Sequence, residues 1–153
     1  METDCHLFSI EEDTIKAKAM AEAVATSPVY VVADNDCLIL GEGFVQKGLQ
    51  IMERHPDYGL LAATSISDGD YPNGMAGRFE LPEIIPGYCG GVAFVRKGIL
   101  TKFETCTPTQ VDGTIFTEMF RKGYKSGYIP GLRFNHLGAG YSITNPNWWM
   151  KVP

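Results

Sequence analysis

The sequence contains no long hydrophobic run, no cluster of basic residues and no signal peptide. A helix needs roughly 20 consecutive apolar residues to cross a bilayer, so we expect no membrane span. The amino terminus is acidic and lacks the basic-then-apolar layout of a secretory signal. We therefore expect a cytoplasmic protein.

Basic residues are also in the minority, with 13 Lys and Arg against 18 Asp and Glu and a net charge of −5. A nucleic-acid-binding protein usually presents a basic patch, so nucleic acid is not an expected partner. The four cysteines, Cys5, Cys37, Cys89 and Cys106, have no Cys-x-x-Cys spacing. We therefore expect reduced thiols rather than a disulfide framework or a zinc knot, and assign cysteine no chemical role.

The composition is that of an ordinary globular domain, with 44% hydrophobic and 20% charged residues. A chain of 153 residues can bury a substantial core but is short for two domains. We expect a single domain over residues 1–153, with a tail from about residue 138.

Helical and strand patterns alternate along the chain, and turn residues separate them. Helices are expected at 13–26, 41–54 and 112–122, strands at 29–33, 60–63, 92–95, 128–129 and 133–134, and a long loop at 65–88. This alternation predicts an α/β domain with a mostly parallel central sheet.

Asp34 and Asp36 come directly after the apolar run 29–33, so two carboxylates stand at the end of a buried strand. Ligands of open α/β sheets collect outside the carboxyl ends of the strands, and Mg²⁺ and Mn²⁺ prefer oxygen ligands. This position predicts a divalent cation that holds a phosphate. The alternative is that the acids only stabilise a turn, as we expect for the second Asp-x-Asp, Asp68-Gly69-Asp70.

Three segments in sequence order resemble the metal-dependent GT-A glycosyltransferases, most closely their large inverting family 2, which uses nucleotide-diphosphate sugars. They are the strand and acidic motif at 29–40, the Gly-Gly strand at 90–96, and the segment 111–138, which carries Asp112 and His136. The likeness extends over roughly residues 13–140. It implies a GT-A, Rossmann-like three-layer sandwich. Only about 28 residues precede the strand that leads to the acidic motif, so we expect an N-terminally shortened form that lacks the family's base-binding unit.

The resemblance implies the chemical roles of four residues. Asp34 and Asp36 would hold Mn²⁺ or Mg²⁺, and His136 would be a further ligand that favours Mn²⁺. Asp112 would be the general base that activates the acceptor hydroxyl. Asp112 as a helix N-cap and His136 as a hydrogen-bonded structural residue are the alternatives.

The resemblance also suggests where substrate binds. Gly90 and Gly91 would let the substrate approach the backbone, and Asn35 would contact it from within the acidic motif. Trp148 and Trp149 offer aromatic faces that could stack on a sugar acceptor. A strand bulge for the glycines, and core packing for the tryptophans, are equally consistent with the pattern.

The expected function is metal-dependent, inverting transfer of a sugar from a nucleotide-diphosphate sugar to an acceptor hydroxyl. One alternative is a non-catalytic GT-A-like domain that binds a sugar, a metal or a partner chain. An exposed sheet edge would then favour a homo-oligomer. Another is a phosphotransferase with Asp34 as nucleophile and Thr64-Ser65 at the next strand end.

Overall fold

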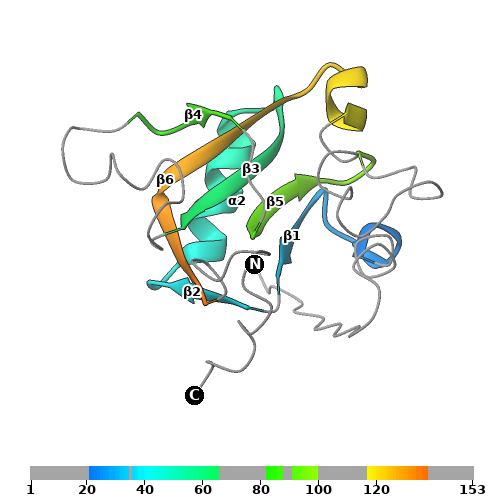
Figure 1. The fold of residues 1–153 in the computed structure, drawn as a ribbon. Coiled ribbons are helices and arrows are strands. Elements are labelled where there is room, and N and C mark those ends of the chain that lie inside the picture. Colours follow the sequence, from blue (N-terminus) through cyan, green and yellow to red (C-terminus); the bar gives the residue numbers. More distant parts are fainter. Residues whose placement is uncertain (1–20, 35, 66–81, 88–90, 100–116, 138–153) are drawn as a thin grey trace, which may run out of the picture.

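The computed structural model describes residues 21–34, 36–65, 82–87, 91–99 and 117–137 (Figure 1). Strands make up most of their regular structure. The strands are β1 (Val29–Ala33), β2 (Cys37–Leu40), β3 (Tyr58–Ser65), β4 (Ile85–Pro86), β5 (Val92–Arg96) and β6 (Lys125–His136), and the helix α2 spans Phe44–Arg54. Residues 21–24 and 117–121 are also helical.

The six strands form one mixed sheet with the order β1-β5-β3-β6-β2, and β4 pairs with β6. Within the described residues, only β3 and β6 pair in parallel, and the other four pairings are antiparallel. Residues 34–36 alone separate β1 from β2 in the chain, although these strands lie at opposite ends of the order. The sheet therefore curls until its ends approach each other, and it resembles a nearly closed barrel (Figure 1).

Consecutive residues of the central strands β3 and β5 are buried. Neighbouring residues of a strand point to opposite sides, so both faces of these strands are covered. One face packs against α2 and includes Leu61, Phe94 and Phe134. The other face carries Leu60 and Val95, and Ile99 and Met119 pack against it. The strands β3 and β5 therefore read as continuous apolar runs rather than as an alternation of polar and apolar residues.

The helix α2 is amphipathic and lies along one face of the sheet (Figure 1). Its buried residues, Phe44, Gly48, Ile51 and Met52, follow the spacing of a single helical stripe.

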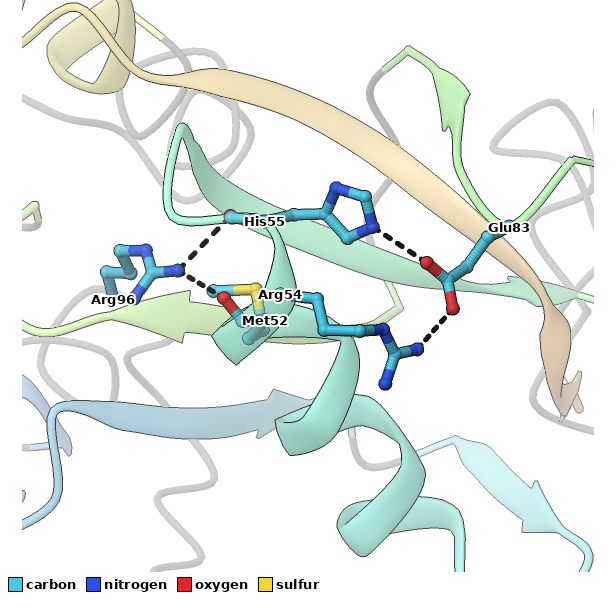
Figure 2. Close-up of polar contacts among 5 residues, drawn as sticks. All are labelled: Met52, Arg54, His55, Glu83 and Arg96. Atoms are coloured by element: carbon cyan, nitrogen blue, oxygen red, sulfur yellow. Dashed lines mark hydrogen bonds and ion pairs between the residues drawn. The ribbon is translucent and has the colours of Figure 1, made fainter.

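Arg96 of β5 closes the carboxyl end of α2 (Figure 2). Its guanidinium donates to the carbonyl oxygens of Met52, His55 (3.2 Å) and Tyr58 (2.8 Å). The last carbonyls of a helix have no partner within it, and they carry the negative end of the helix dipole. The guanidinium of Arg96 therefore supplies hydrogen-bond donors to carbonyl oxygens at the end of α2 and in the segment that leads into β3.

The expectation of a GT-A, Rossmann-like three-layer sandwich with a mostly parallel sheet was wrong. The described residues form mostly strands, and these strands make one curled sheet with a single parallel pairing. This arrangement overturns the expectation. The strands β1, β3 and β5 were predicted, but strand direction depends on the connections. The reversal of β5 between β1 and β3 leaves no run of parallel neighbours.

Several element boundaries also differ from the expectation. The two short strands expected at 128–129 and 133–134 are one strand, β6, whose register against β3 shifts after Ile129. The strand β2 was not predicted, and neither was β4, which lies within the expected loop 65–88. In the part of the chain that the structure describes, no helix has both the length and the apolar character needed to span a membrane.

Candidate metal centre

The acidic motif lies in the short connection between β1 and β2. Asp34 follows the last residue of β1, and its amide donates to the carbonyl oxygen of Gly91 at 2.8 Å. The amide of Cys37 donates to the carbonyl oxygen of Asp34 at 3.1 Å, which closes a tight turn. The chain therefore turns sharply between the two strands, and Asp36 immediately precedes β2.

The carboxyl end of β6 lies beside this turn. The antiparallel register of β2 and β6 pairs Cys37 directly with His136, and the amide of Leu137 donates to the carbonyl oxygen of Asp36 at 2.8 Å. Directly paired residues of antiparallel strands project to the same face with their Cβ atoms close together. The sheet thus brings the thiol, the imidazole and the neighbouring carboxylate to one place.

Asp36, Cys37 and His136 each offer one ligand atom, and these atoms all lie within 4.8 Å of one another. Nε2 of His136 is 3.2 Å from Oδ2 of Asp36, and Sγ of Cys37 is 4.0 Å from Oδ1 of the same carboxylate. About a third of each of the Asp36 and His136 side chains is exposed, at 31% and 32%. The group is thus reachable from solvent, yet its members are held by backbone pairing.

The hydrophobic core forms the inner wall of this centre. Phe134 is buried beneath it, its ring centroid 6.2 Å from that of His136, and Cys37 packs against the same core cluster. Gly91 has a φ of +95°, and a Cβ there would lie 2.6 Å from Cζ of Phe134 and 3.5 Å from Sγ of Cys37. A glycine is therefore required where β5 begins, both for its conformation and for the space beside the centre.

The structure brings together two of the residues that the sequence placed at one metal. Asp36 and His136 are separated by 100 residues in the chain and are in direct contact. Asp34 lies at the end of β1, outside the group of three ligand atoms, so its role as a ligand stays a prediction.

Other predicted site residues are not described. Asn35, Gly90, Asp112, Trp148 and Trp149 lie outside the described residues, so their assigned roles remain predictions.

Cys37 is the member of the group that the sequence did not indicate. Its spacing to the other cysteines carries no metal signature, and its pairing with His136 arises only from the register of β2 against β6. Its place immediately after Asp36 was the only available signal.

The sequence matches no model of a known protein family and no curated protein. The geometry of the Asp36, Cys37 and His136 group and the motif resemblance are therefore the grounds for assigning a function.

Proposed function

We propose that this protein transfers a sugar from a nucleotide-diphosphate sugar to an acceptor hydroxyl, with inversion and with the help of a divalent cation. One observation supports the proposal most directly: Nε2 of His136 lies 3.2 Å from Oδ2 of Asp36. The motif resemblance assigns these two residues to one cation, and nothing in their sequence separation requires them to meet.

The donor set suits a divalent cation. A carboxylate and an imidazole are common metal ligands, and the partial exposure of both side chains leaves room for a ligand from solvent. A cation held there would neutralise the diphosphate leaving group as the sugar departs. Mn²⁺ and Mg²⁺ are the cations that the resemblance implies.

The connection between β1 and β2 holds Asp36 by its backbone. The amide of Asp34 donates to Gly91 and the carbonyl oxygen of Asp36 accepts from the amide of Leu137, so the backbone of each acid is hydrogen-bonded to a neighbouring segment of the sheet. Such preorganisation lowers the cost of placing a charged diphosphate, because the ligands need not be ordered when it binds.

Calorimetric titration tests the donor site. UDP, GDP and their common sugar conjugates are titrated into the protein with and without Mn²⁺, Mg²⁺ or Zn²⁺. We expect binding that requires a cation and is lost in Asp36→Ala. The matched control is Asp57→Ala, an exposed carboxylate just before β3, at the end of that strand remote from the centre, which should bind as the wild type does. Absence of binding to every nucleotide would contradict the proposal.

The catalytic base is tested separately. We propose Asp112 as this base, and a general base contributes roughly 10²- to 10⁴-fold to a rate. Asp112→Asn should therefore lose turnover by about that factor and keep cation-dependent nucleotide binding. Normal turnover in this variant would remove Asp112 from the role.

A non-catalytic, partner-binding domain is the second candidate, and exposed apolar side chains at the end strand β2 favour it. Leu38 and Ile39 of the end strand β2, and the nearby Leu137, are 53%, 39% and 49% exposed. An unpaired strand edge with apolar side chains can pair with another chain, including a second copy. Sedimentation analysis of wild type and Leu38→Lys would reveal such an association.

For a phosphotransferase, the environment of Thr64 is unfavourable. This residue is 3% exposed, and its hydroxyl donates to the carbonyl oxygen of Ile129 at 3.3 Å. A buried hydroxyl with a backbone partner is poorly placed to hold a phosphate beside Asp34.

A further inference from the structure

We propose that Cys37 is the third protein ligand of this centre, and that the centre selects a thiophilic divalent cation such as Zn²⁺ over Mg²⁺ and Mn²⁺. This inference rests on the proposed function in one respect: both assume that a cation binds at this site. It departs from the Mn²⁺ or Mg²⁺ that the motif resemblance implies.

The first argument is the geometry of the three donors. The register of β2 against β6 places Cys37 and His136 opposite each other, and Asp36 precedes Cys37. Tetrahedral zinc with ordinary bond lengths separates a nitrogen and an oxygen ligand by about 3.3 Å, and a sulfur from either by about 3.6 Å. The observed 3.2 Å between Nε2 and Oδ2 is already close to the first value. The three ligand atoms lie within 4.8 Å of one another, so the sulfur would move inward by at most about 1.2 Å to complete the set.

The second argument is the chemistry of the donors. Mg²⁺ requires near-octahedral oxygen coordination and binds sulfur poorly, whereas thiolate and imidazole together suit zinc and its chemical relatives. A set of one sulfur, one nitrogen and one oxygen is therefore a poor site for Mg²⁺ and a good one for Zn²⁺ or Co²⁺.

The third argument is the number of ligands. Three protein ligands leave one tetrahedral position open, as in catalytic rather than structural zinc sites. The partial exposure of Asp36 and His136 puts that position within reach of water or of a phosphate oxygen. Cys37 is partly buried and packs against the core cluster that contains Phe134.

Cobalt replacement provides the test, because Co²⁺ reports its own ligands. Titration of the metal-free, full-length protein with Co²⁺, in the absence of nucleotide, should produce the intense visible bands of a tetrahedral ion. A near-ultraviolet charge-transfer band should accompany them, which only a thiolate ligand gives. Zn²⁺ should displace the colour, and a large excess of Mg²⁺ should not.

Two variants assign the signal. Cys37→Ser should lose the charge-transfer band and weaken Zn²⁺ binding by at least about tenfold, with little change for Mn²⁺. Cys106→Ser should leave both unchanged, and circular dichroism verifies that each variant is folded. Weak octahedral Co²⁺ spectra, or a charge-transfer band that persists in Cys37→Ser, would overturn the inference.

The two proposals can fail independently. A thiolate-bound Co²⁺ without nucleotide binding would support the metal site and contradict sugar transfer. Cation-dependent nucleotide binding in a protein whose Co²⁺ spectrum lacks the thiolate charge-transfer band would support sugar transfer and refute the role of Cys37.

Discussion

The ring of Phe94 lies directly over Gly48 of α2. A Cβ at position 48 would lie 2.0 Å from Cζ of this ring, far inside any allowed contact. Phe94 is fully buried in β5, and its ring also stacks on Phe44, with 5.7 Å between the centroids. The helix can therefore lie close to the sheet only because Gly48 has no side chain.

We predict that Gly48→Ala destabilises the protein. Alanine normally improves a helix by about 1 kcal/mol over glycine, but overpacking of a tight core costs roughly 1–3 kcal/mol and displaces Phe94. Chemical denaturation should show a net loss of stability. Gly131→Ala is the matched control, because a Cβ there meets nothing within 4 Å, and it should stay within about 0.5 kcal/mol of wild type. A Gly48→Ala variant as stable as this control would contradict the prediction.

We predict that Gly91→Ala lowers the free energy of unfolding more than Gly98→Ala does. Its φ is +95° and a Cβ would collide with Phe134, whereas Gly98 has a similar φ of +90° and open space around it. Gly98→Ala should therefore cost about 1–3 kcal/mol from backbone strain, and Gly91→Ala roughly 1–3 kcal/mol more from overpacking. Urea denaturation of the two variants measures this difference, and equal losses would argue against the collision.

Arg96 is expected to contribute more to stability than the exposed Arg54. Arg96→Met keeps the apolar stem but removes the guanidinium that donates to the carbonyl oxygens of Met52, His55 and Tyr58, so we expect a loss of about 2–4 kcal/mol. The carbonyl oxygen of His55 keeps the amide of Tyr58 as a second donor. Arg96→Lys should recover only part of it, because an ammonium cannot span three acceptors as a planar guanidinium does. Arg54→Met, which removes only a surface ion pair with Glu83, should cost less than about 1 kcal/mol. Similar losses for Arg96→Met and Arg54→Met would contradict this ranking.

Glu83 should make the stability depend on pH in the acid range. Hydrogen bonds from His55 and then Arg54 hold the pKa of its carboxyl below the ordinary value of 4.5 (Figure 2). A carboxyl with a lowered folded-state pKa stabilises the protein above its unfolded pKa and loses that contribution as pH falls through the folded pKa.

The difference in melting temperature between wild type and Glu83→Gln should therefore be constant above about pH 4.5 and disappear at lower pH. It should be small and shrink further in high salt, because the pair is exposed. Glu53→Gln, on the exposed side of α2, is the control. A difference that grows as pH falls would have the wrong sign for this mechanism.

Local patterns in the sequence predicted the elements well wherever one element could be read by itself. The apolar runs near Val31, Leu61 and Phe94 are strands, and the periodic segment 41–54 contains α2. These predictions depended on spacing along a short stretch of chain, which sets the burial of one strand or one helix face. The short strand β2 was missed because its four residues carry no periodicity that distinguishes a strand from a turn.

Part of the candidate centre was also predicted, since Asp36 and His136 were assigned to one metal and they are in contact. Cys37 was not, because its place beside His136 depends on which residues of β2 and β6 pair. A shift of that register by one residue would turn the Cys37 side chain to the opposite face.

The amino-acid sequence by itself determined the strands β1, β3 and β5, the helix α2, and which side chains offer carboxylate, imidazole or thiol donor atoms. The tertiary structure decided the direction of β5, the curl that brings β1 and β2 together, and the meeting of Asp36, Cys37 and His136. The physical reason is range: propensity and periodicity act over a few neighbouring residues. Strand order and register depend on burying side chains of the whole sheet at once, on one face against α2 and on the other against the cluster that includes Ile99 and Met119.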